Sequence, residues 1–182
     1  MPDTSASPRV PRGRHAPPLE VRLRRQRGRL FEAAAIVFAR SGYADASAEA
    51  ISREAGMSKA TFYEHFANKE ECILALFDES AAGIARDVRT VAAREYPDAA
   101  ARLHAGVSAF VAALTDNPAL AQTVIVETVG AGPRTVDRRD AVLQAFADWM
   151  YDDNAANAAR YDTRTFVSRD DAFAVMGAIF EL

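Results

Sequence analysis

The segment from Ser47 to Phe66 carries side chains and helix ends that can hydrogen-bond to a polyanion. Ser47 and Ser58 stand at positions typical of helix N-caps, and Gly56 lies between them, where a tight turn is expected. Helix N-termini present free backbone N–H groups and the positive end of a dipole, so they bind phosphate groups. The spacing therefore predicts two short helices joined by a turn, with both N-termini directed outward.

The second short helix is predicted to have one apolar face and one small, polar face. Phe62 and Phe66 lie four residues apart and therefore point to the core. At about 100° per residue, the opposite face carries Ala60, Thr61 and Glu64, and the flanks carry Lys59, Tyr63 and His65. Small side chains allow close approach to base edges in a DNA major groove, while long donors at the flanks can hold phosphates. Two such helices around a glycine turn are typical of a helix-turn-helix.

Three stretches of the chain follow the pattern of a known family. They are Phe31-Glu-Ala-Ala, then Phe38-Ala-Arg-Ser-Gly42-Tyr43, and then, after Ser47 and Ile51, the run Ala55-Gly56-Met57-Ser58-Lys59-Ala60-Thr61-Phe62-Tyr63-Glu64-His65-Phe66-Ala-Asn68-Lys69-Glu70-Glu71. Together they resemble the DNA-binding domain of the TetR/AcrR family of transcriptional regulators, over about Arg27 to Phe77. The remainder of the chain is similar to the family only in its helical character.

The resemblance implies a set of DNA-contacting positions. These are Ser47, Lys59, Ala60, Thr61, Tyr63, His65 and Lys69, to which the N-cap argument adds Ser58. In the family pattern Tyr63, His65 and Lys69 would hold phosphates, and Lys59, Ala60 and Thr61 would meet base edges. Position 60 is often glycine in the family, and the alanine methyl here could contact a thymine methyl group.

Several of these residues have a second interpretation. Tyr63 could be half-buried packing instead of a phosphate contact. Glu64 could accept a hydrogen bond from a cytosine amine, repel phosphate, or simply be solvated. His65 is not expected to bind a metal ion, because no cysteine or second histidine lies at ligand spacing.

The fold class predicted for the chain is all-α, since alternating β-branched runs are absent apart from Thr123–Val126, which lies within a helical window. Prolines break any helix before residue 18, and Gly42 is expected to end the first helix as a left-handed cap. Helices are expected over residues 19–40, 47–55, 59–66, 68–94, 98–115, 117–128, 135–159 and 169–182.

The charge of the chain is divided unevenly. Residues 1–30 carry eight arginines and two acidic residues, whereas the whole chain has a net charge of −3. A basic N-terminus on an acidic body indicates either a polyanion partner there or a solvated tail. We expect a disordered basic arm at 1–18, a helix-turn-helix domain at 19–69, and a helical ligand-binding and dimerisation domain at 70–182.

The family resemblance also implies a ligand pocket in the C-terminal helices, whose occupation would tilt the fourth helix. Candidate lining residues, which could equally fill a packed core, are His104, Val107, Phe110, Leu114, Val124, Phe146, Trp149, Met150 and Phe173. Their apolar character favours a small apolar ligand. By resemblance the protein is a homodimer built by its last two helices, of which only one, short and without a terminator, is visible here. The chain is then either naturally brief or truncated.

Other functions find no support in the sequence. No nucleophile elbow, phosphate loop or Cys-His pair is visible, so we expect neither an enzyme nor a cofactor or metal site. The single cysteine fits the reducing cytoplasm, and no apolar stretch is long enough to cross a bilayer.

The leading hypothesis is a sequence-specific transcriptional regulator that binds a palindromic operator in double-stranded DNA and, as a repressor, is released by a small molecule. The alternative is a helical small-molecule or partner-binding protein with a vestigial DNA-binding head. The incomplete C-terminus favours that alternative, and the intact pattern from Lys59 to Lys69 opposes it.

Overall fold

The structure, a computed structural model, describes residues 18–180, and within that range it is helical and has no strand. The predicted all-α class is confirmed. The predicted arm at residues 1–18 lies outside the described residues, apart from Pro18. The elements are α1 (Leu19–Asp45), α2 (Ala48–Glu54), α3 (Lys59–His65), α4 (Lys69–Ala92), α5 (Ala99–Thr115), α6 (Pro118–Gln122), the π-helix η1 (Thr123–Glu127), α7 (Thr128–Gly130), α8 (Pro133–Tyr161) and α9 (Arg169–Phe180).

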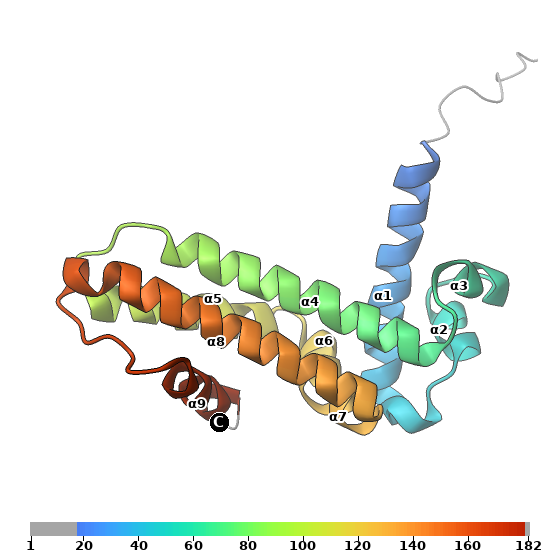
Figure 1. Ribbon diagram of the computed structural model, residues 1–182. Helices are drawn as coiled ribbons and strands as arrows, with labels where there is room; N and C mark the ends of the chain where they lie inside the picture. The colour runs from blue at the N-terminus through green and yellow to red at the C-terminus, as the bar shows by residue number, and fades with distance from the viewer. Residues whose placement is uncertain (1–17, 181–182) are drawn as a thin grey trace, which may run out of the picture.

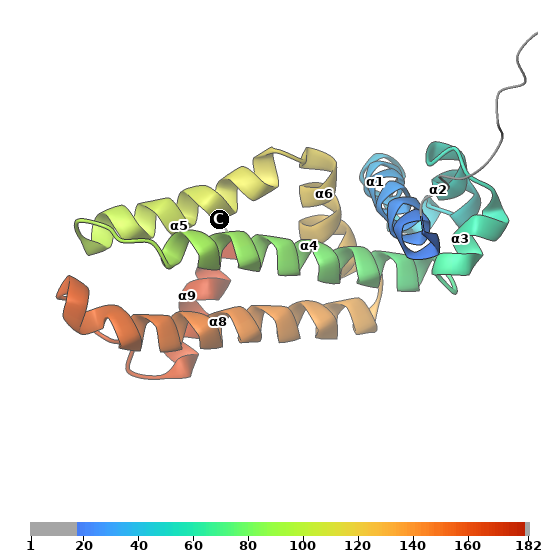
Figure 2. The same cartoon turned by 90° about the horizontal axis from the view of Figure 1, so that it is seen from above.

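The helices form two groups, which α4 connects (Figures 1 and 2). α1, α2 and α3 gather at one end of the molecule, and α4, α5 and α8 run lengthwise away from them. α4 begins beside α3 and packs along α5, while α9 packs against α8. The N-terminal group is therefore a helix-turn-helix domain, and the rest is a helical domain whose long axis starts at the turn after α3.

A core of aromatic and aliphatic side chains holds the N-terminal group together. Leu30, Val37 and Phe38 of α1 are fully buried, at spacings that place them on one helical face. Phe62 of α3 is also fully buried, and its ring lies 5.4 Å from that of Phe66. The ring of Phe31 in α1 lies 5.5 Å from that of Phe66, so α1 packs directly against the helix-turn-helix.

The first helix breaks at Gly42 but does not end there. Gly42 has φ +73° and ψ 161°, and the chain then makes one further helical turn to Asp45. The positive φ agrees with the expectation for this glycine, whereas its ψ is extended, so the predicted left-handed cap at this residue is wrong. Residues with a Cβ rarely adopt this φ, which explains the glycine.

The segment Thr123–Glu127 is helical as predicted, but it adopts π geometry. The run begins with four consecutive β-branched residues, which have a lower preference for a regular α-helix. The Thr123 hydroxyl, which donates to the Ala119 carbonyl at 2.9 Å, also lies 3.2 Å from the Ala35 carbonyl of α1. The Glu127 carboxylate accepts a hydrogen bond from the backbone N–H of Tyr43 at 2.8 Å. η1 thus attaches the C-terminal helices to α1.

The C-terminal helices pack less completely than the N-terminal group. α5 has no buried residue, and the core cluster of α8 and α9 centres on Ala147, Ala172 and Met176. One half-buried ion pair joins α5 to α8: a guanidinium nitrogen of Arg102 lies 2.7 Å from both carboxylate oxygens of Asp153. This looser packing leaves room for cavities.

A helix that crosses a membrane must be both long and apolar. Among residues 18–180 no single helix is long and apolar enough to cross a membrane; one pair bent by 97°, Ala99–Thr115 with Pro118–Gly130, meets the criterion when its two parts are combined. In the same part of the chain no cluster of three or more His, Cys, Asp or Glu side chains could hold a metal ion.

The thiol of Cys72 lies in the N-terminal core and is fully buried. Burial raises the pKa of Cys72 to about 12, although the nearby Arg27 lowers it in part. A thiol in an unfolded chain has a pKa of about 8.5. Between that pH and the folded pKa, the folded protein keeps the Cys72 proton and the unfolded chain loses it. This group contributes stability that is complete below the unfolded pKa and is lost as the pH rises toward the folded value.

We expect iodoacetamide to leave Cys72 unmodified in the native protein at a pH between these two pKa values, and to alkylate it rapidly in urea, because the thiolate is the reactive species. Mass spectrometry after timed exposure measures the modification, and Cys72→Ser controls for reaction at other side chains. Rapid labelling of the folded protein at that pH would contradict the buried position of the thiol.

Candidate functional site

The helix-turn-helix is built by two capped helices and a glycine turn. The Ser47 hydroxyl oxygen accepts from the backbone N–H of Ala50, and that of Ser58 accepts from Thr61, each at 3.1 Å. Gly56 has φ +63° and makes the turn between α2 and α3. Both predicted N-caps and the turn are present.

Arg29 holds the turn from α1, a role that the sequence did not reveal. Its guanidinium donates to the carbonyl of Ala55 at 2.6 Å, at the C-terminus of α2. A Cβ at Gly56 would lie 3.4 Å from the same guanidinium. That distance is an ordinary contact, so the positive φ is what requires a glycine here.

The recognition helix α3 presents the face that the helical periodicity predicted. Phe62 is buried, whereas Lys59, Ala60 and Glu64 are exposed. Tyr63 is 50% exposed, with its ring edge-on to Phe62, so it packs on the core and still offers its hydroxyl to solvent. A helix with this face can enter a major groove and bring a tyrosine to the adjacent phosphates.

A ridge of arginines extends this surface along the start of α1. Arg22, Arg24 and Arg25 are exposed, and none of them pairs with a carboxylate among residues 18–180. Arg27 lies over the rings of Phe31 and Phe66, at 4.9 and 5.3 Å. In Figure 1 the first turns of α1 project beyond α2 and α3. Unpaired positive charge thus lies at the same end of the molecule as α2 and α3.

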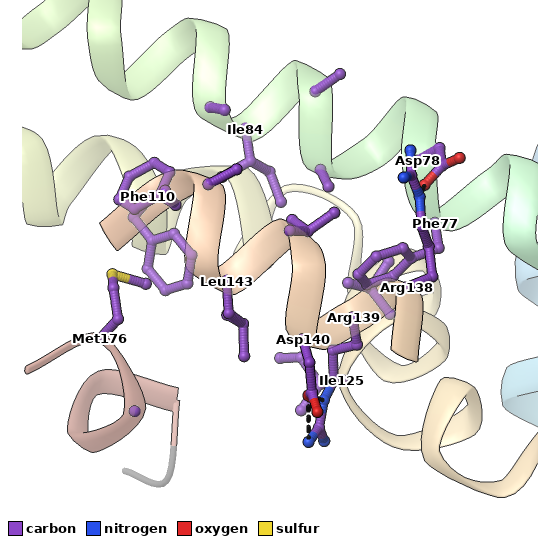
Figure 3. Close-up of a pocket in the computed structure, with 18 of the residues that line it drawn as sticks. Phe77, Asp78, Ile84, Phe110, Ile125, Arg138, Arg139, Asp140, Leu143 and Met176 are labelled. Carbon is purple, nitrogen blue, oxygen red and sulfur yellow. Dashed lines mark hydrogen bonds and ion pairs between the residues drawn. The ribbon is translucent and has the colours of Figure 1, made fainter. Parts of the chain in front are cut away.

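A cavity of about 640 Å³ lies in the C-terminal domain, in the half nearer to the helix-turn-helix. We call it the proximal cavity; it is lined by the middle of α4, η1, the first half of α8 and α9, with Phe110 of α5 at one end. Figure 3 shows Phe110 and Met176 at one end, and Asp78, Arg138 and Asp140 at the other. Arg138 donates to Asp78 at 2.6 Å, and Arg139 pairs with Asp140 at 3.2 Å. The cavity is therefore apolar with one charged end.

A second cavity of about 320 Å³ lies further from the helix-turn-helix, between α4, α5 and the second half of α8. We call it the distal cavity. Of the candidate lining residues, Val124 and Phe173 line the proximal cavity, Val107, Trp149 and Met150 line the distal one, and Phe110 and Phe146 line both.

Two of the candidates, His104 and Leu114, line neither cavity. α5 faces the distal cavity with Leu103, Gly106, Val107 and Phe110, so His104 points to solvent and Leu114 lies a turn beyond the end of the cavity. Sequence reasoning also missed that α4 supplies a wall, because its apolar residues fit a packed core equally well.

Comparison with known proteins identifies the N-terminal domain. Residues 30–76 match the family model described as "Bacterial regulatory proteins, tetR family". The N-terminal domain, over these residues, is that of the tetR family. A curated relative, the HTH-type transcriptional activator FasR of Mycolicibacterium smegmatis, is 39% identical over 85 residues, which are 47% of this chain and 38% of FasR. The match therefore spans well under half of that relative's length.

Solved structures share the fold of this chain. The fatty acid degradation regulator FadR from Bacillus halodurans superposes with a TM-score of 0.77 at 19% identity, over 93% of this chain and 83% of that one. FadR from Bacillus subtilis, solved in complex with stearoyl-CoA, has a TM-score of 0.74 at 18% identity, over 85% and 82% of the two chains. At these identities the likeness establishes the fold, including that of the C-terminal domain.

The structure places two of the predicted DNA-contacting residues, Lys69 and His65, partly inside the protein. The ammonium of Lys69 lies 2.8 Å from the carbonyls of Tyr43 and Ala44 and 3.1 Å from that of Ala46. A cation at the C-terminal end of α1 also complements the helix dipole. The imidazole Nε2 of His65 is buried and has no hydrogen-bond partner among the described residues. For both residues phosphate binding stays a prediction, and Lys69 has in addition a structural role.

We expect Lys69→Met to lower the free energy of unfolding by about 2 kcal/mol, because three carbonyl groups lose a charged donor. Urea denaturation measures the change. The matched control is Lys59→Met, whose ammonium lies over the ring of Tyr63 and makes no hydrogen bond to the described residues. Equal urea midpoints for Lys69→Met and the wild-type protein would show that the ammonium is free for another partner.

Proposed function

We propose that this chain is a transcriptional regulator that binds a palindromic operator in double-stranded DNA as a homodimer, in the cytoplasm. One observation carries the proposal: α3 presents small and polar residues outward while its buried Phe62 fixes it to α1. Two half-sites, one turn of DNA apart, are matched by two recognition helices related by a two-fold axis. The same geometry opposes a vestigial DNA-binding head, since nothing in the motif has been lost.

The arginines at the start of α1 support a binding mode that depends strongly on salt. Each phosphate neutralised by an arginine or lysine releases a counterion, so affinity falls as the salt concentration rises. The first test is a mobility-shift titration on DNA upstream of the protein's own gene, at low and moderate salt, with the mass in solution measured alongside. Competitor-resistant binding by a dimer is the expected result. Weak, sequence-indifferent binding by a monomer would contradict the proposal.

The proposed effector is a small apolar molecule that carries a hydrocarbon chain. The walls of the proximal cavity are mainly apolar, and its volume of about 640 Å³ is within the usual range for ligand pockets. Two structures with this fold are named as fatty-acid regulators or were solved with stearoyl-CoA, which supports the same ligand class.

The proposed response runs through η1 and α4. Val124 of η1 lines the proximal cavity, while its neighbour Thr123 and Glu127 contact α1. α4 lines the same cavity and, through Lys69, holds the end of α1. A ligand that favours one arrangement of these helices shifts the spacing of the two recognition helices in a dimer, to the extent that its affinity differs between the two states.

We propose that the unliganded protein represses its target and that the ligand releases it. The relative FasR is named as an activator, which makes activation the second candidate. A reporter gene behind the operator distinguishes them. Deletion of the regulator raises expression under repression and lowers it under activation.

We expect Tyr63→Ala to weaken binding to every duplex by about fivefold to tenfold, because a phosphate contact and the ring that positions it are lost together. Tyr63→Phe keeps the ring and should lose only the contribution of the hydroxyl. Fluorescence anisotropy with operator and random duplexes measures both variants. Unchanged affinity of Tyr63→Ala would remove this residue from the interface.

We expect Thr61→Ala and Lys59→Ala to change the preference among operator variants by about 1–3 kcal/mol at the contacted base pair, because these residues meet base edges. Competition binding against a set of single-base operator variants measures the preference. Glu32→Ala, on an exposed position of α1 away from α3, is the control. A uniform loss across all variants would assign both side chains to phosphates instead.

A further inference from the structure

The proximal and distal cavities meet at three shared side chains. Phe110 of α5, Phe146 of α8 and Met176 of α9 line both of them. Met176 is only 4% exposed, and the ring of Phe146 lies edge-on to that of Trp149 in the distal wall at 5.1 Å. Only side chains therefore separate the two cavities at this point, and side chains of this kind can change rotamer without any movement of the backbone.

The charged side chains that an incoming molecule could reach lie at one end of the proximal cavity. The charged end of the proximal cavity, with Arg138 and Arg139, lies opposite to Phe110 and Met176 (Figure 3). Beyond these two residues, the distal cavity is walled mainly by apolar side chains such as Val88, Leu103, Trp149 and Met150. A long molecule with one polar end would find its polar contacts at the proximal end only.

The polar residues of the distal cavity are already paired with one another. Arg102 donates to both carboxylate oxygens of Asp153 at 2.7 Å and to the carbonyl of Ala92 at 3.1 Å. Asn157 donates to the Asp153 carbonyl at 2.8 Å. The side chains of Arg102 and Asp153 are only 16% and 22% exposed, so separating them would leave a charge without a partner in a largely buried site. The pairs that Arg138 and Arg139 make at the proximal end are more exposed, at 34% to 56%, and such surface pairs exchange with an incoming anion at little cost. The distal cavity therefore suits the apolar end of a chain.

We propose that both cavities take a single linear hydrocarbon chain, with its polar end at Arg138 and Arg139 and its tail between Phe110, Phe146 and Met176. The three shared side chains act as a gate, and the distal cavity makes the protein selective for long chains. This inference rests on the proposed apolar effector. The α4 wall from Phe77 to Ala92 spans about 22 Å at about 1.5 Å per residue, a length that only a long chain fills.

Two glycines allow each cavity to be filled separately. Gly106 lines only the distal cavity and Gly177 only the proximal one. A Cβ at either position would have no atom within 4 Å, so a larger side chain can enter the space without a clash at its base. Both glycines lie within helices, where leucine is a better helix former, and the substitutions should not unfold the protein.

The test compares octanoyl-CoA with stearoyl-CoA by isothermal titration calorimetry on the full chain, as wild type, Gly106→Leu and Gly177→Leu. Each buried methylene contributes about fourfold in affinity, so filling the distal cavity should weaken stearoyl-CoA by at least about tenfold. Octanoyl-CoA should bind Gly106→Leu as it binds the wild type. Gly177→Leu should weaken both compounds, because it narrows the cavity that every chain enters.

Trp149 supplies a second readout, since it is the single tryptophan of the chain and lines the distal cavity. Stearoyl-CoA should change its emission in the wild type, and octanoyl-CoA should not. Two results would overturn the gate while both compounds still bind. One is full affinity of Gly106→Leu for stearoyl-CoA, and the other is unchanged Trp149 emission when stearoyl-CoA is bound. In either case the proposed effector class stands. If neither compound binds the wild type, the effector class itself falls, and the gate with it.

Discussion

The break in α1 at Gly42 is the constraint on which the two halves of the molecule depend. Beyond it the last turn of the helix exposes backbone groups that need partners. Lys69 of α4 donates to three carbonyls of this segment, and Glu127 of η1 accepts from the N–H of Tyr43. Two charged side chains from different helices thus converge on one short segment, so the position of the helix-turn-helix is coupled to both.

The two halves differ in how completely they are packed. In the N-terminal domain the buried faces of α1 and α3 interlock, with Phe38 and Phe62 fully buried. In the C-terminal domain α5 buries no residue completely, and the distal cavity lies between it and α8. A rigid, dense domain suits a surface that must hold its geometry against DNA, whereas a loosely filled one can reorganise around a ligand at lower cost.

The π-helix η1 lies where these two requirements meet. This single π-helical turn contacts both the proximal cavity and α1. Val124 lines the proximal cavity, and Thr123 contacts α1. In the proposed response, a ligand in the cavity would act on a segment that is attached to α1 by hydrogen bonds.

The sequence by itself determined the features that depend on near neighbours along the chain. The caps Ser47 and Ser58, the turn at Gly56 and the outward face of α3 all follow from spacings of a few residues, which is why they could be predicted. Tertiary structure alone decided the role of Lys69 and which of the apolar helix faces enclose space instead of filling it. An apolar residue at helical spacing satisfies a packed core and a cavity wall equally well, and only the distances between helices distinguish the two.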